Sequence, residues 1–278
     1  MQAWRNAFQK QLSKDVNALG VTLARFIWAW PFAALYVFGL YQWQPADIPD
    51  FSLSFVMYIL GASVAQIIAT VLMVKLFQLK NYAIGVGLAK SEAILAAILG
   101  VAFFATVLTP IGWFGVILGA FAVFLLSGVR LRYISWPTLL LGLGSGLAFA
   151  LTSLWVREAS LLLAVPFPYS AAWVLLWVIA TEAVMLVVWL FFKDKNTLRA
   201  LLKRSKLTLL ISIFSCIGSL GWFTAMSLES VALVKTLGQI EVLFSLLISV
   251  FFFKEKLVRT DHLGLLLIVI AAICVVWA

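Results

Sequence analysis

A strongly apolar stretch near the end of the chain, VALVKTLGQIEVLFSLL at residues 231–247, contains three polar side chains that could do chemistry. Lys235 could bind an anion, Gln239 could exchange hydrogen bonds, and Glu241 could carry a proton. A charged side chain at the centre of a membrane helix costs about 2.5–3.5 kcal/mol on insertion scales. These residues must therefore line water or find partners inside the molecule.

Other ionisable side chains stand in apolar surroundings elsewhere in the chain. They are Arg25, Lys90, Glu92 and Glu182. Enzyme motifs are missing, because His262 is the only histidine, no nucleophile can be paired with a base, and neither an HExxH nor a phosphate-binding loop occurs. Cys216 and Cys274 lie in apolar runs and form no metal-binding pattern. We therefore expect no enzyme activity, no cofactor and no metal.

Composition places the chain in a membrane. Hydrophobic residues make up 64% of its 278 residues and charged residues 11%, well outside the range of soluble domains. The net charge of +9 could suggest a nucleic-acid partner, but binding of that kind needs basic residues on one soluble face. Here they lie between apolar runs, so we expect a lipid bilayer around the chain and no nucleic acid.

A membrane helix needs about 20 mainly apolar residues, and nine such runs are present. They lie near 18–41, 51–77, 81–105, 110–129, 137–159, 168–192, 207–228, 231–253 and 261–277. The runs do not alternate between polar and apolar residues, which argues against a strand barrel. A shorter fragment, WRNAFQKQLSK, precedes them, and we interpret it as the cytoplasmic half of a first helix. A nine-helix protein is the alternative.

Lysine and arginine set the expected orientation. With the fragment counted as the first span, basic residues cluster in the loops after odd-numbered spans. The positive-inside rule then places the odd-numbered loops in the cytoplasm of a multi-pass protein, which we expect in a bacterial inner membrane. The stretch KDKNTLRALLKRSKL at 193–207 sets leucines against a basic face, which predicts a helix on the inner membrane surface.

The two halves of the chain are related in sequence. Sliding 81–129 onto 230–278, an offset of 149 residues, aligns Glu92 with Glu241 and Gly115 with Gly264, besides eight other identities. By the charge rule the aligned spans run in opposite directions, as in transporters built from inverted repeats. We predict a first repeat at 1–129 with a partial first helix, and a second at 137–278.

Helix geometry groups the candidate ligand contacts. Lys235 and Gln239 share one stripe of a helix, and the repeat maps Gln239 onto Lys90. Lys90 and Lys235 would then face one cavity, where two ammonium groups favour a carboxylate or phosphate ligand. Alternatively, each lysine is neutralised by a glutamate or extends to the membrane surface. Glu92 and Glu241 are either proton carriers or hydrogen-bonding contacts between helices.

Four more residues complete the candidate site. Arg25 is a weaker ligand contact. Trp177, on a stripe with Glu182, could line the cavity, although packing is the favoured explanation of that stripe. Lys254 and Glu255 could close the cytoplasmic mouth as ion pairs, or merely be solvated.

Several of these features resemble the EamA-like branch of the drug/metabolite transporter superfamily. The resemblance rests on Arg25 in ARFIWAWPF and on GQIEVLFSLLISVFFFKEKLVRTDHLGLLLIVIAAICVVW at 238–277, where Glu255 and Gly264 match the family's glutamate and glycine. It implies an all-α, ten-helix membrane fold of five plus five inverted helices, with a central cavity and alternating access. The first half departs from the pattern, because Ala105 and Thr106 occupy the positions of Lys254 and Glu255.

Three functions are compatible with these observations. The first is a secondary transporter of a small anionic or zwitterionic metabolite. The second is an exporter of amphipathic or aromatic compounds, lined by residues such as Trp28, Trp177 and Trp222. The third is a membrane partner subunit without a working cavity. The sequence leaves the substrate, the direction of transport, the coupling ion and the oligomeric state open.

Overall fold

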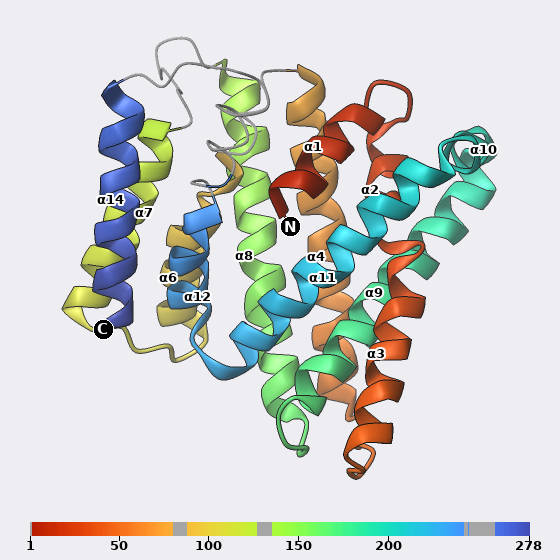
Figure 1. Cartoon of the computed structure of the whole chain (residues 1–278), viewed down its shortest axis with the longest axis horizontal. Helices are drawn as coiled ribbons and strands as arrows, with labels where there is room; N and C mark the ends of the chain where they lie inside the picture. The colour runs from red at the N-terminus through yellow and green to blue at the C-terminus, as the bar shows by residue number, and fades with distance from the viewer. Residues whose placement is uncertain (1, 80–87, 127–134, 242–243, 245–258) are drawn as a thin grey trace.

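A computed structural model of the chain describes all residues except 1, 80–87, 127–134, 242–243 and 245–258. The described residues form helices joined by short loops, with no strand among them (Figure 1). Five segments are long and apolar enough to cross a membrane: Ala18–Trp43, which comprises two helices, and Leu53–Leu79, Trp136–Leu162, Tyr169–Lys193 and Ser205–Leu228. The expectation of an all-helical membrane protein is confirmed at this level.

The helices fall close to the runs predicted from hydropathy. In chain order they are α1 (Gln2–Leu12), α2 (Ala18–Phe26), α3 (Ala29–Trp43), α4 (Leu53–Leu79), α6 (Glu92–Phe103), α7 (Pro110–Leu126), α8 (Trp136–Leu162), α9 (Tyr169–Lys193), α10 (Lys195–Lys203), α11 (Ser205–Leu228), α12 (Val231–Leu237), the 3₁₀ helix η2 (Gly238–Ile240) and α14 (Arg259–Val276).

Three of the predicted continuous spans are interrupted. The first span breaks between α2 and α3 at Ile27 and Trp28, where Ser212 of α11 satisfies the freed backbone. Its hydroxyl donates to the Ala24 carbonyl at 2.7 Å and accepts from the Trp28 amide at 3.2 Å. The other breaks lie in the 81–105 and 231–253 runs, at the centre of the molecule. Hydropathy could not predict these breaks, because it records polarity and not backbone geometry.

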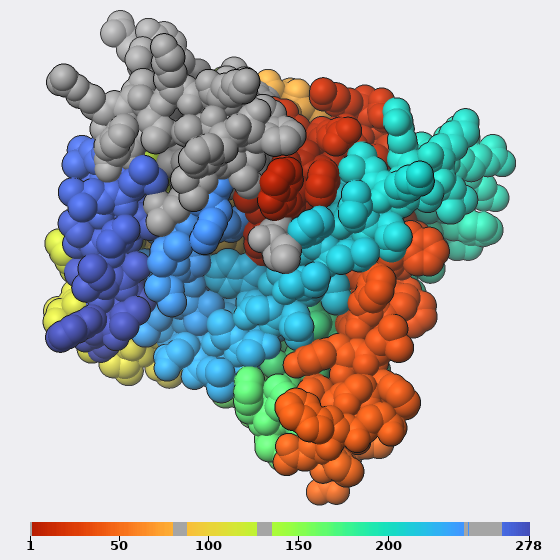
Figure 2. All heavy atoms as spheres, in the orientation of Figure 1, coloured from red at the N-terminus to blue at the C-terminus, as the bar shows by residue number. Residues whose placement is uncertain are grey.

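The helices pack as an inclined bundle (Figure 1). The most extensive pairings are α4 with α8 and α7 with α14. Helix α11 crosses one face obliquely, with α1 against its side, and these two helices lie in the middle of the surface drawn in Figure 2. Helices α6 and α12 lie side by side between these groups, so residues from both halves of the chain meet there.

Small residues pack the interior of the bundle, and apolar side chains cover its outer surface. Ala24, Ala62 and Ala150 are fully buried in the main core, where small side chains let helix backbones approach. Large apolar side chains such as Phe38 and Val184 are instead exposed on the outer surface. An outward apolar surface of this extent is expected where lipid, not water, surrounds the helices.

Helix α10 corresponds to the predicted basic amphipathic segment at 193–207. Asp194 caps its N-terminus by accepting from the backbone amide of Thr197 at 3.1 Å and from the Thr197 hydroxyl at 2.6 Å. These hydrogen bonds lower the pKa of Asp194 below its ordinary value. Leu201, on the inner face of α10, is buried. Arg204, directly after the helix, forms an ion pair with Asp15, with 2.7 Å between Nη2 and Oδ2.

Close contact between α7 and α14 depends on the two aligned glycines. A Cβ on Gly115 would lie 3.1 Å from the carbonyl oxygen of Ala271, and a Cβ on Gly264 would lie 3.3 Å from that of Ala122. Ala122 and Ala271 are themselves related by the offset of 149 residues. The two contacts are therefore reciprocal.

We predict that Gly115→Val and Gly264→Val each destabilise the protein by about 1–3 kcal/mol, because the new side chain must force the two helices apart. Thermal unfolding in detergent measures the effect as a lower Tm. Gly39→Val is the matched control, since no atom lies within 4 Å of a Cβ at that position. Equal Tm values for all three variants would contradict the packing described for this helix pair.

Candidate functional site

A small polar cavity lies at the centre of the bundle. The space that water centres can occupy within it is about 80 Å³, which is room for a few waters. Its lining comes from α1, α2, α4, α6, α8, α11 and α12, together with the turn before α6 and Glu241 after η2: Gln2, Arg5, Asn6, Arg25, Gln66, Met73, Ala89, Lys90, Glu92, Phe149, Thr152, Ser153, Ser219, Trp222, Phe223, Met226, Lys235 and Glu241.

The first central break positions Lys90 and Glu92. Lys90 and Ser91 form a turn, and α6 begins at Glu92. The carboxylate therefore sits at a helix N-terminus, where the helix dipole favours negative charge. Gly146 of α8 allows the approach to this break, because a Cβ there would lie 3.2 Å from the Glu92 amide nitrogen.

The second central break lies in the other half of the chain. Helix α12 tightens into η2 at Gly238–Ile240, and Glu241 follows directly. A Cβ on Gly238 would overlap the Trp222 ring of α11, so only glycine permits this contact. Lys235 Nζ lies 4.4 Å from the centroid of the same ring, a cation–π contact. By the offset of 149, Gly238–Ile240 corresponds to residues 89–91, which contain the first break.

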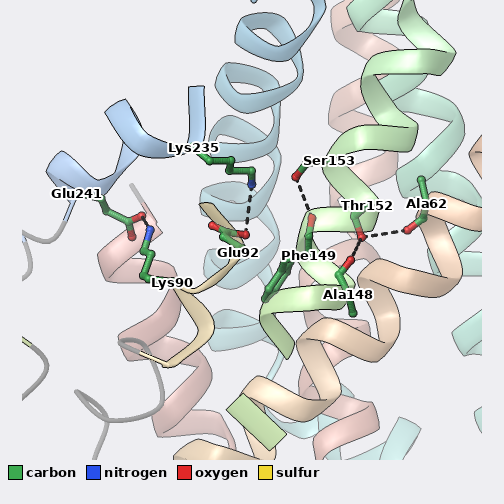
Figure 3. A network of polar contacts seen from close by, with 9 residues as sticks. All are labelled: Ala62, Lys90, Glu92, Ala148, Phe149, Thr152, Ser153, Lys235 and Glu241. Atoms are coloured by element: carbon green, nitrogen blue, oxygen red, sulfur yellow. Dashed lines mark hydrogen bonds and ion pairs between the residues drawn. The ribbon is translucent and has the colours of Figure 1, made fainter. Parts of the chain in front are cut away.

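Two ion pairs connect the breaks in a crossed arrangement (Figure 3). Lys90 Nζ donates to Glu241 Oε2 at 2.9 Å, and Lys235 Nζ donates to Glu92 Oε2 at 3.4 Å. The four side chains are only 9–16% exposed. Each lysine thus pairs with the glutamate of the other half of the chain. Both lysines line the one cavity, and each is neutralised there by a glutamate. That they bind an anionic ligand stays a prediction.

Arg25 is buried beside this cluster and does not extend to the membrane surface. Its side chain is 3% exposed. It donates through Nη1 to the Thr70 hydroxyl of α4 at 2.5 Å and through Nε to the Ser215 hydroxyl of α11 at 3.2 Å. The guanidinium therefore joins helices from both halves of the chain at the cavity wall.

Helix α1 contributes lining residues that the sequence reasoning missed. Arg5, Asn6 and Gln9 are buried, whereas Trp4 is exposed. The guanidinium of Arg5 donates to the Asn6 side-chain oxygen at 2.8 and 3.2 Å. The sequence does contain a signal for this polar face, because the polar residues of α1 lie three and four positions apart, which is the spacing of one helix face. A polar face turned inward identifies a helix that lines water in a membrane protein.

The cavity lining has an excess of positive charge. Its cationic side chains are Arg5, Arg25, Lys90 and Lys235, and its carboxylates are Glu92 and Glu241. These four cationic side chains outnumber the two carboxylates of the lining. Within the described ranges, no group of His, Cys, Asp and Glu side chains could hold a metal ion.

Other predicted site residues lie away from the cavity. Gln239 is 1% exposed and packs against Gly119 of α7, with no hydrogen-bond partner for its amide among the described residues. Trp177 is 38% exposed and contacts the rings of Phe51 and Phe55. Gln239 turns aside because η2 departs from α-helical geometry. The predicted gate, Lys254 and Glu255, falls outside the described residues.

Comparison with known proteins defines the fold and then the family. Among solved structures, 24 chains match. One of these matches, described as the crystal structure of a protein, has a TM-score of 0.70 and 14% sequence identity to this chain. The match covers 98% of this chain and 91% of that chain. That likeness shows the fold. No curated protein matches the chain.

The sequence profile of the EamA-like transporter family matches residues 136–277, just over half of the chain. The chain belongs to the EamA-like transporter family. It is a multi-pass membrane transporter, and the expectations of that family and of a non-enzymatic protein are confirmed.

A double-mutant cycle on Lys90→Met and Glu241→Gln tests the crossed pairing. Each single change leaves a buried charge without its partner, whereas the double change removes both. We expect a stabilising coupling of about 1–3 kcal/mol in the free energy of unfolding. The control cycle joins Lys75→Met to Glu241→Gln, because Lys75 is exposed on α4 and does not line the cavity. Equal coupling in both cycles would contradict the crossed arrangement.

Proposed function

We propose that the protein is a secondary transporter that moves a small anionic or zwitterionic metabolite by alternating access through the central cavity. The observation that carries this proposal is the meeting of Lys90 and Lys235, from broken helices of the two halves, in one cavity with excess positive charge. Interrupted helices at the membrane midplane are where transporters commonly bind substrates and coupling ions.

The architecture we propose is five plus five inverted helices, in repeats at 1–129 and 137–278, with a partial first helix. The offset of 149 moves α4 (Leu53–Leu79) onto 202–228, where α11 lies, and α7 (Pro110–Leu126) onto 259–275, where α14 lies. Helices α7 and α14 run antiparallel (Figure 1). Pairings also repeat, since α2 packs on α4 and α11 just as α9 packs on α11 and α4. These correspondences support the inverted repeat.

Substrate binding in this proposal requires the ion pairs to open. A water space of about 80 Å³ is well below the roughly 300–1,000 Å³ of small-molecule sites. A carboxylate or phosphate of the substrate would compete with Glu241 for Lys90 and with Glu92 for Lys235. Protonation of either glutamate favours the substrate in that competition. Glu92 and Glu241 are therefore proposed coupling residues, and Arg25 a further anion contact.

Gln239 and Trp177 enter this proposal only if the helices rearrange, because neither lines the cavity in this conformation. Lys254 and Glu255 remain the proposed gate. For orientation we propose that the basic, odd-numbered loops face the cytoplasm of a bacterial cell. The end of the bundle that carries α10 would then be the cytoplasmic end (Figure 1).

A second candidate function is export of amphipathic or aromatic compounds. It is favoured by the apolar part of the cavity wall, to which Phe149, Trp222 and Phe223 contribute. Of the aromatic residues expected for this role, Trp222 lines the cavity, whereas Trp28 and Trp177 do not. The third candidate, a partner subunit without transport, is favoured by the small volume of the cavity.

A panel of compounds can separate these functions. Lactate, glycerol phosphate and alanine represent anions and a zwitterion, tryptamine an aromatic compound without a carboxylate, and tetraethylammonium a cation without a ring. Our proposal predicts that at least one of the first three raises the Tm of the purified protein and is taken up by proteoliposomes. Uptake of tryptamine and tetraethylammonium alone would favour the second candidate, and no uptake of any compound the third.

Lys235→Met should weaken uptake of the transported anion or zwitterion by about tenfold to a hundredfold, the cost of one hydrogen bond to a charged group. Initial uptake rates over a range of concentrations measure this effect. Lys75→Met is the matched control, because Lys75 is exposed on α4 and does not line the cavity. Unchanged uptake by Lys235→Met would remove the lysine from the proposed site.

A further inference from the structure

Glu182 is the most deeply buried carboxylate among the described residues. It lies in the middle of α9 and is 0% exposed. Neither carboxylate oxygen has a hydrogen-bond partner within the described part of the chain. Glu92 and Glu241, by contrast, both accept from a lysine. An ionised carboxylate without partners is the least stable arrangement a membrane interior can hold.

Glu182 lies among buried residues of the main core, and one buried charge faces it from a neighbouring helix. Its neighbours on α9, Val178 and Leu186, are buried in the main core. The helices packed against α9 are α2, α3, α4, α8, α10 and α11. Their charged side chains are Arg25, Lys75, Arg157, Glu158, Lys195, Arg199, Lys203 and Lys206. Arg25 is the one of these that is buried, and its charge acts on Glu182.

Arg25 lies on a helix that reaches both the cavity and α9. It lines the cavity, it belongs to α2, which packs against α9, and its charge interacts with those of Arg5, Glu182 and Glu92. Its hydrogen bonds go to the hydroxyls of Thr70 and Ser215, which are uncharged. The guanidinium thus has no carboxylate within ion-pair distance among the described residues. Its charge can therefore interact with an anion in the cavity and with the carboxyl group of Glu182 at the same time.

We propose that Glu182 is a proton-binding site outside the cavity, and that Arg25 couples its protonation to the binding of an anionic substrate. In this conformation Glu182 carries a proton as a neutral carboxylic acid. The proton comes from bulk water on one side of the membrane and is released to the other, so that the carboxylic acid and the carboxylate interconvert with no other reactant. This inference rests on the proposed transport function.

The coupling follows from the position of Arg25. Without an anion, the positive charge of Arg25 favours the ionised form of Glu182. An anion bound at the cavity offsets that charge, and the neutral form of Glu182 becomes more favourable. By thermodynamic reciprocity, a proton on Glu182 strengthens anion binding at Arg25 by the same factor. Substrate and proton then move together in the same direction.

A purely structural role for Glu182 makes a different prediction. A carboxylic acid that only fills space in the core would be replaced by glutamine with no effect on driven transport, because glutamine has nearly the same shape and is neutral. A proton carrier cannot be replaced in this way, since glutamine does not titrate. The Glu182→Gln variant therefore separates the two roles while preserving packing.

Infrared difference spectroscopy of the purified full chain tests the protonation state directly, without any substrate. We expect a buried carboxylic acid C=O band at neutral pH that is lost in Glu182→Gln and retained in Glu158→Gln, a glutamate of α8 at the helix end. In Arg25→Gln the band should persist to higher pH, because the charge that favours ionisation is gone. Absence of a band assigned to Glu182 in the wild type would overturn the proposal.

Transport in proteoliposomes tests the coupling. A pH difference of one unit drives accumulation of a co-transported substrate by up to about tenfold per proton. With lactate, glycerol phosphate and alanine as probes, the wild type should accumulate the transported probe on the alkaline side. Glu182→Gln should lose part of this accumulation, because Glu92 and Glu241 remain as the other proposed coupling residues, but it should retain exchange of labelled for unlabelled probe. Glu158→Gln should keep both.

The outcomes separate the two proposals. If no probe is exchanged by the wild type, the transport function fails, and the infrared band still decides whether Glu182 is protonated. If the wild type accumulates a probe and Glu182→Gln accumulates it equally, transport stands and the role of Glu182 is overturned.

Discussion

The cost of placing a charge in hydrocarbon determines how the centre of this protein is built. Four ionisable side chains from the two interrupted helices meet in one small cavity, and each lysine is neutralised by the glutamate of the other half. Removing either partner would leave a buried, uncompensated charge, which is worse than removing both. The crossed pairs therefore hold the two halves together, and any movement that opens the cavity must first replace these partners with water or with a ligand.

The backbone is arranged to serve these pairs. Both central helices lose regular geometry immediately before their glutamates, at Lys90–Ser91 and at Gly238–Ile240. The breaks need neighbours that come close, and Gly146 and Gly238 permit it, since a Cβ at either position would meet the facing helix. Non-helical backbone is tolerated within a membrane only where protein or a water-filled cavity surrounds it. Here the cavity and the neighbouring helices meet that condition.

Much of this organisation could be predicted from the sequence, for identifiable reasons. Helix positions follow from apolar runs, and Glu92 and Glu241 were found because two halves related by a constant offset preserve them. The position of the Gln239 side chain could not be predicted in this way. A regular helix would place it on the stripe of Lys235, but η2 turns it towards Gly119. Arg5 was not predicted as a cavity residue, because charged side chains near the end of a membrane helix usually reach water, whereas here a polar face of α1 is turned inward.

The two halves align in sequence at a constant offset but differ in charge, and this difference bears on the proposed mechanism. Lys90 aligns with Gln239, and Lys235 aligns with Val86, so each half supplies one lysine from a different helical turn. Arg25 aligns with Val174 and Glu182 with Ala33, neither of which can ionise. The proposed inverted repeat would give two related conformations, and these differences in charge would make them unequal in energy. In that proposal a ligand that interacts with Arg25 shifts the balance between conformations through contacts that only one half of the chain supplies.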